Sequence, residues 1–198
     1  MPPTNASPRH LDPRRPLVLD TRELGRRPGS IRRVRTSVPA PERLSLELIG
    51  VAPGAAVELD LRLESVMEGV LVSGTATAAL TGECGRCLDP VTSTISVDLQ
   101  ELYAYPDSAT GETTEDGEVS RLDGDFLDLE PVLRDAVVLD LPLTPLCRPD
   151  CAGLCAGCGG RLDELPSGHT HEQTDPRWAD LASLLQPSPI PVTHRQES

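Results

Sequence analysis

The chain contains the segment Cys147-Arg-Pro-Asp-Cys151-Ala-Gly-Leu-Cys155-Ala-Gly-Cys158-Gly159-Gly160, in which four of its six cysteines fall within twelve residues. Thiolates are soft, negatively charged ligands, and a Cys-x2-Cys step followed by glycines is a tight turn that lets two sulfurs converge on one tetrahedral zinc ion. The other two cysteines repeat this step in Cys84-Gly85-Arg86-Cys87. The cysteine pattern therefore predicts metal binding.

The length and composition of the chain favour a cytoplasmic protein. Its 198 residues are enough for one main domain with a real core plus appended segments. No run approaches the roughly 18 apolar residues that a membrane span requires, and the N-terminus, rich in Pro and Arg, has no apolar signal-peptide core. In a reducing cytoplasm, cysteines spaced in pairs are metal ligands rather than disulfide partners.

Charge is distributed unevenly along the chain, whose formal net charge is −13. Residues 1–43 carry ten Arg and four acidic residues, whereas the remaining residues carry eight Arg and 27 acidic residues. A strongly acidic body, with very few aromatic side chains for stacking on bases, argues against a long RNA-tracking groove. Direct RNA contact is therefore expected in the N-terminal arginines, or else this segment is a solvated arm. These residues are Arg22, Arg26, Arg27, Arg32, Arg33 and Arg35.

Residues 17–144 are expected to form a β-rich main domain. Alternating apolar residues predict half-buried strands over 44–48, 57–63 and 92–105, and further apolar runs predict strands over 17–20, 31–38 and 70–80. The strand 70–80 leads into Cys84, and the strand 92–105 follows Cys87. The first cysteine pair should therefore lie at the tip of an antiparallel hairpin, with its sulfurs on an exposed loop.

Two helices are predicted in the second half of the chain. Leu129, Val132, Leu133, Ala136 and Val137 follow helical spacing, which predicts a helix over 128–140 that ends before Pro142. A shorter helix is expected over 175–186, with Trp178 as its apolar anchor. Residues 1–16 and 187–198 are expected to be disordered tails, and 106–124 a flexible acidic loop.

The fold class expected from these elements is α+β. An antiparallel β-rich body carries a central helix, and the segment 145–186 follows as a C-terminal Cys/His zinc knuckle with a short C-terminal helix.

Several motifs together resemble one known family. They are Arg22-Glu23-Leu24-Gly25, Cys84-Gly85-Arg86-Cys87-Leu88, Leu139-Asp140-Leu141-Pro142-Leu143, Gly153-Leu154-Cys155-Ala-Gly-Cys158-Gly159 and Asp175-Pro176-Arg177-Trp178. In these residues, which span roughly 17–186, the chain resembles the bacterial YceD family of large ribosomal RNA subunit accumulation proteins, in an actinobacterial style. Where many relatives carry Cys-x-Cys after the knuckle, this chain has His169-Thr170-His171, and imidazole is an equally good zinc ligand.

The resemblance implies a non-enzymatic role in the synthesis, processing or accumulation of 23S ribosomal RNA, and hence in ribosome biogenesis. The implied partner is precursor 23S ribosomal RNA or a large-subunit assembly intermediate, reached directly or through a ribosomal protein. Neither a membrane nor a small-molecule substrate is implied.

Six cysteines and two histidines give eight candidate ligands, the number that two closed tetrahedral zinc sites require. The favoured partition joins the pair Cys84 and Cys87 to the pair Cys147 and Cys151. It joins Cys155 and Cys158 to His169 and His171. The rival partition gives one zinc ion all four clustered cysteines and leaves the first pair as a spare dithiol.

A closed site leaves no position for a reactive water, so structural zinc without catalysis is expected. One alternative is a zinc-stabilised protein-interaction module without RNA contact, which the acidic body favours. Another is an enzyme, either a zinc hydrolase or a thiol oxidoreductase. Asp89-Pro90 after the first pair argues against the oxidoreductase, because redox pairs of that kind open a helix. Arg86 would offset thiolate charge or meet a phosphate.

Overall fold

The structure is a computed structural model that describes residues 10–108 and 119–171. The chain divides into two compact units, Met1–Cys151 and Ala152–Ser198, and each is described by itself. Among the described residues, no helix is both long and apolar enough to cross a bilayer.

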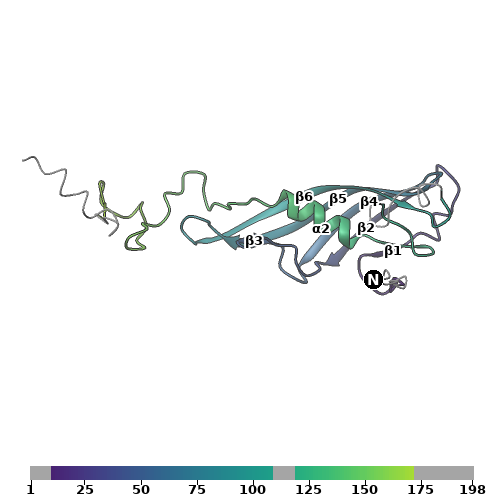
Figure 1. Cartoon of the computed structure of the whole chain (residues 1–198), viewed down its shortest axis with the longest axis horizontal. Coiled ribbons are helices and arrows are strands. Elements are labelled where there is room, and N and C mark those ends of the chain that lie inside the picture. The colour runs from purple at the N-terminus through teal and green to yellow at the C-terminus, as the bar shows by residue number, and fades with distance from the viewer. Residues whose placement is uncertain (1–9, 109–118, 172–198) are drawn as a thin grey trace, which may run out of the picture. The chain divides into compact units, whose positions relative to one another are not determined.

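The first unit is organised around an antiparallel sheet (Figure 1). Strand β2 pairs with β4, β4 with β5, and β5 with β6 along its whole length, while the short β3 pairs with the far end of β5. A separate two-stranded sheet joins β1 to β7. The strands are β1 (Val18–Asp20), β2 (Ile31–Pro39), β3 (Ile49–Gly50), β4 (Ala56–Ser65), β5 (Gly69–Glu83), β6 (Pro90–Ala104) and β7 (Phe126–Asp128).

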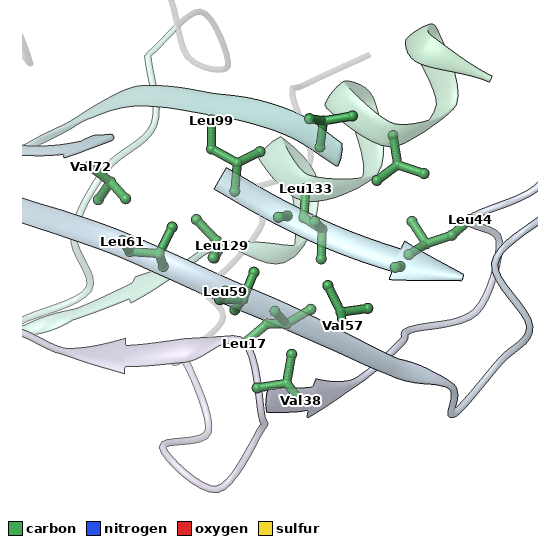
Figure 2. Close-up of a cluster of buried hydrophobic side chains, with 14 of the residues drawn as sticks. Leu17, Val38, Leu44, Val57, Leu59, Leu61, Val72, Leu99, Leu129 and Leu133 are labelled. Carbon is green, nitrogen blue, oxygen red and sulfur yellow. The ribbon is translucent and has the colours of Figure 1, made fainter. Parts of the chain in front are cut away.

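The core forms on the inner face of this sheet because apolar and polar residues alternate along each strand. On β4, Val57, Leu59, Leu61 and Leu63 are buried, whereas the residues between them face solvent or are half-buried. The helix α2 (Glu130–Asp140) covers this face beside β6. Figure 2 shows Leu133 among the strand side chains that make up the core.

The predicted strands over 17–20, 31–38, 57–63, 70–80 and 92–105 are confirmed, but the strand over 44–48 is wrong. Its residues instead form a turn, in which Leu46 N–H donates to Ile49 O and Val51 N–H donates to Leu44 O. The turn sends the Leu44 side chain into the core, which explains the apolar spacing without a strand. Strand β7 was missed because three residues carry too little periodicity to be recognised.

The central helix begins at Glu130 rather than at residue 128. Asp128 belongs to β7, and its Oδ1 accepts the Glu130 N–H at 2.9 Å, which satisfies one free donor at the helix start. Proline is tolerated in the first turn of the helix, because a backbone N–H there would have no acceptor within the helix. The helix ends before the extended Leu141, as expected for a residue that precedes proline.

The chain ends differ from expectation where they can be described. Residues 10–16, expected in a disordered tail, contact the turn at Asp123, whose carboxylate accepts the Leu11 N–H at 2.6 Å and lies 2.9 Å from His10. Residues 109–118 of the expected acidic loop, the expected helix 175–186 with Trp178, and the expected tail 187–198 lie outside the described residues.

Leu133 gives a direct test of helix packing. The substitution Leu133→Ala should lower the free energy of unfolding by about 2 to 5 kcal/mol, because it leaves a cavity at a fully buried position. Leu139→Ala on the same helix is the matched control; this side chain is 85% exposed, and its loss should cost less than about 0.5 kcal/mol. Urea denaturation followed by circular dichroism measures both, and equal effects would contradict the packing.

Candidate metal centres

The first candidate metal centre collects four sulfurs from two distant parts of the first unit. Cys84, Cys87, Cys147 and Cys151 place their Sγ atoms within 4.8 Å of one another. The Cys84 and Cys151 sulfurs are 3.8 Å apart, and the Cys87 and Cys147 sulfurs are 3.5 Å apart. Both close pairs therefore join one cysteine of the first Cys-x2-Cys step to one cysteine that follows α2.

The first two cysteines lie at the tip of the β5–β6 hairpin, as predicted. Cys84 N–H donates to Asp89 O, and Leu88 N–H donates back to Cys84 O, so the tip is closed by its own backbone. Leu88 adopts a left-handed backbone with φ 62°, which is uncommon for a side chain of this size. This uncommon backbone is compatible with a hairpin tip that is held in place by contacts with another segment of the chain.

The segment that leaves α2 supplies the contacts that hold the hairpin tip. Gly85 N–H donates to Pro145 O at 2.8 Å, and the Arg86 guanidinium donates through Nη1 to Cys151 O at 2.8 Å. These bonds bring Cys147 and Cys151 over the tip. Arg86 was expected to offset thiolate charge or to meet a phosphate, whereas its guanidinium donates to the backbone carbonyl of Cys151.

The prediction that the tip sulfurs are exposed is wrong. Cys84 is fully buried, and Cys87 and Cys151 are also buried, while Cys147 is exposed. The physical reason is the covering segment 144–151, which turns a loop tip into an interior position. Periodicity along the hairpin alone could not have indicated this cover.

The four clustered sulfurs do not share the same proton affinity. Burial raises the pKa of the Cys84 thiol, but the N–H groups of Cys147 and Arg86 outweigh burial and lower this pKa to about 6. The Asp89 N–H lowers the pKa of Cys87, but burial and the neighbouring thiols outweigh it and raise this pKa to about 12. A divalent cation would replace the remaining protons, so metal affinity should fall as the pH decreases.

The second candidate metal centre is local and lies within the second unit. Cys155, Cys158, His169 and His171 place one ligand atom each within 4.8 Å of one another. Cys158 Sγ is 3.5 Å from His169 Nε2, which is 3.0 Å from His171 Nε2. These ligands are exposed or half-buried, in contrast to those of the first cluster.

A tight turn positions the second pair of cysteines. Gly159 N–H donates to Cys155 O, and Cys155 N–H donates to Gly160 O. A Cβ built at Gly157 would lie 2.5 Å from the His171 ring, so any side chain here would displace the imidazole. The absence of a side chain at this position thus lets the imidazole approach the turn, a role that the sequence analysis missed although the Cys-x-Gly-Cys spacing signals it.

Both clusters fit a tetrahedral metal ion by donor type and by spacing. Zinc–sulfur bonds of about 2.3 Å and zinc–nitrogen bonds of about 2.0 Å place tetrahedral ligands roughly 3.3 to 3.8 Å apart. The shortest ligand separations in the two clusters, 3.0 to 3.8 Å, lie close to that range. Two Cys/His clusters in this chain could therefore hold metal ions.

The eight ligands meet in the two groups of the favoured partition. Cys84 and Cys87 lie with Cys147 and Cys151, as the favoured partition has them, whereas the rival partition would leave this first pair as a spare dithiol. That the clusters bind metal stays a prediction.

The arginines predicted to contact RNA do not form one open basic surface. Arg22 pairs with Asp20, Arg32 lies 3.3 Å from Glu23, and Arg35 lies 2.9 Å from Asp60. Arg26 lies 3.4 Å from Asp107 and stacks over the Tyr105 ring. Of these six arginines, only Arg27 and Arg33 are exposed without an ion pair among the described residues. RNA contact through these residues stays a prediction.

Comparisons with known proteins identify relatives of the chain. Residues 72–185 match the model of a family described as the large ribosomal RNA subunit accumulation protein YceD. An uncharacterized protein of Mycobacterium tuberculosis is 54% identical over 172 residues, which cover 87% of this chain and 83% of the relative. An uncharacterized protein of Mycobacterium leprae is 48% identical over 178 residues, covering 90% and 81%. No solved structure matches the chain.

The two clusters predict a metal stoichiometry. Titration of the reduced, metal-stripped protein with Co²⁺, followed by its visible absorption, should saturate at two ions per chain. Cys84→Ser should remove the ion bound by sulfur alone, and Cys158→Ser should remove the mixed sulfur–nitrogen ion, because each variant breaks one cluster. Loss of the same ion in both variants would contradict the partition.

The Arg86 contact predicts a smaller, local effect. Arg86→Met should lower the free energy of unfolding by about 1 kcal/mol and speed hydrogen exchange at the Gly85 amide, because it releases the hydrogen bond to Cys151 O. Arg33→Met, at an exposed position without an ion pair among the described residues, is the matched control. Unchanged hydrogen exchange at Gly85 in the Arg86 variant would argue against a role of the Arg86–Cys151 hydrogen bond in holding the hairpin tip.

Proposed function

Because this chain belongs to the YceD family of large ribosomal RNA subunit accumulation proteins, we propose that it is a non-enzymatic factor in 23S ribosomal RNA accumulation. The proposed role covers the synthesis, processing or protection of that RNA, and through it the assembly of the large ribosomal subunit. The protein would act in the cytoplasm, where ribosomes are assembled. The family match over residues 72–185 is the observation that carries this proposal.

We further propose that both clusters bind structural zinc. Cysteine and histidine are the ligand types that structural zinc sites use, and neither cluster contains a carboxylate. The first cluster would tie the β5–β6 hairpin to the segment after α2. Its binding free energy would then contribute directly to the stability of the fold.

The donor count supports a non-catalytic role. Four protein ligands complete a tetrahedron, so a bound zinc ion keeps no open position for water or substrate. Hydrolysis assisted by zinc needs such a position. The thiol oxidoreductase alternative is disfavoured by geometry as well, because Cys84 and Cys87 are buried beneath the segment 144–151 instead of opening a helix.

A second candidate function is a zinc-stabilised protein-interaction module without direct RNA contact. The ion pairs of Arg22, Arg26, Arg32 and Arg35 favour it, because paired guanidinium groups have less charge to offer to phosphates. In that case the chain would reach the ribosomal RNA through a ribosomal protein.

Deletion of the gene tests the main proposal. The amount of 23S ribosomal RNA relative to the small-subunit RNA should fall, and wild-type protein should cosediment with large-subunit precursors in sucrose gradients. Cys84→Ser should fail to restore the RNA level, because it breaks the first cluster. Thr94→Ala, at an exposed position of the same hairpin, should restore it. Normal RNA levels after deletion, together with no cosedimentation, would reject the proposal.

The same gradients separate the two candidate functions. If the chain reaches RNA through its six N-terminal arginines, cosedimentation should fall when all six are changed to Gln together in a protein that keeps both clusters. If cosedimentation persists, the result supports the protein-interaction module over RNA contact through these arginines. Those six are Arg22, Arg26, Arg27, Arg32, Arg33 and Arg35.

A further inference from the structure

A cavity of about 520 Å³ lies beside the start of α2, and no cysteine is among the residues that line it. Its lining consists of Arg15, Pro41, Glu42, Arg43, Glu130 and Arg134. Three guanidinium groups from three separate segments thus converge on one hollow, together with two carboxylates. None of these three arginines belongs to the residues that the sequence predicted to contact RNA.

Glu130 fixes two of the guanidinium groups side by side. Arg15 Nη2 donates to Glu130 Oε2, and Arg134 Nη2 donates to Glu130 Oε1, so both carboxylate oxygens are occupied. One carboxylate therefore holds two positive charges in place, and Arg15 Nη1 also lies 3.7 Å from the Asp128 carboxylate. Arg134 Nε is shielded from solvent and has no hydrogen-bond acceptor among the described residues. A buried donor without an acceptor is unfavourable and calls for an explanation.

Arg43 adds a third guanidinium that is free of ion pairs within the described part of the chain. Its side chain is exposed, and its backbone has φ 65°, the left-handed region that side chains rarely adopt. Strained backbone of this kind persists where the surroundings impose it, and it recurs at ligand sites. The turn at residues 41–43 thus presents Arg43 to the cavity at a cost to the backbone.

We propose that Arg15, Arg43 and Arg134 form a binding site for a phosphate group of RNA. Guanidinium groups present planar forks of donors that match phosphate oxygens, and a phosphate in the cavity would supply acceptors for the exposed Arg43 guanidinium. The cavity is a discrete pocket, which suits one or two phosphates held on an otherwise acidic protein. The assignment to RNA rests on the proposed function; the preference for an oxyanion rests on the residues alone.

Fluorescence anisotropy with a labelled single-stranded RNA of twelve nucleotides tests the site in the full-length, zinc-loaded protein. Arg43→Gln should weaken binding about tenfold and reduce the salt dependence of binding by roughly one phosphate contact. Arg62→Gln, which removes the same charge from an exposed position on β4 that does not line the cavity, should stay within about twofold of wild type. Unchanged binding in Arg43→Gln and Arg15→Gln would overturn the site.

Two further variants separate ligand binding from structure. Glu42→Gln removes a carboxylate from the cavity lining and should tighten RNA binding a few-fold, the opposite sign to Arg43→Gln. Arg43→Gly relieves the left-handed backbone and should raise the melting temperature while weakening RNA binding. A glycine variant that binds as well as wild type would overturn the assignment of Arg43.

Titration with inorganic phosphate, followed by calorimetry, identifies the source of the oxyanion. Binding of labelled RNA that depends on Arg43 supports the proposal, and competition by inorganic phosphate adds to it. Binding of inorganic phosphate without any binding of RNA would overturn the assignment to RNA. The sucrose-gradient and 23S RNA measurements are independent of these titrations, so a failed pocket with a normal deletion phenotype leaves the proposed function standing.

Discussion

The structure depends on the meeting of two sulfur pairs that lie far apart in the chain. Cys87 and Cys147 are 60 residues apart in sequence, yet their sulfurs lie 3.5 Å from each other. Closing a loop of that length costs chain entropy, and crowding four sulfurs raises the cost of any negative charge among them. A divalent cation would offset both costs. The aliphatic core under α2 and the tip contacts through Gly85 and Arg86 then keep the sulfurs within reach of such an ion.

Much of this architecture follows from local patterns that a sequence displays. Alternation along residues 57–63 and helical spacing from Leu129 to Val137 report which side of an element is buried, and the structure bears out both. The grouping of the cysteines also followed from ligand number and order along the chain. Local patterns could not predict burial that is caused by another segment. The burial of Cys84 depends on residues 144–151, and the Leu44 turn depends on the core beneath it. The ion pairs of Arg26 with Asp107 and of Arg35 with Asp60 could not be predicted either, because the partners are distant in sequence.

In this protein the net charge of a segment does not show how much of its charge is left unpaired in the folded chain. Residues 1–43 look basic as a sequence, but in the folded chain Arg22, Arg32 and Arg35 face carboxylates. At the cavity beside α2, Glu130 accepts from Arg15 and Arg134 at once, and the Arg43 side chain has no ion pair among the described residues. An acidic protein can thus meet a polyanion at a small number of organised positions. The electrostatic footprint has to be read from contacts and not from composition.

The two clusters also differ in how much of the polypeptide each one needs. The second gathers its ligands from residues 155–171, a single short hairpin-like knuckle, whereas the first draws on residues 84–151. During vectorial synthesis the second cluster can close as soon as its own seventeen residues have emerged. The first has to wait until β5, β6 and α2 have been made and packed. An ion bound among Cys84, Cys87, Cys147 and Cys151 would therefore require the packed sheet and helix of the first unit, whereas an ion in the second cluster would not.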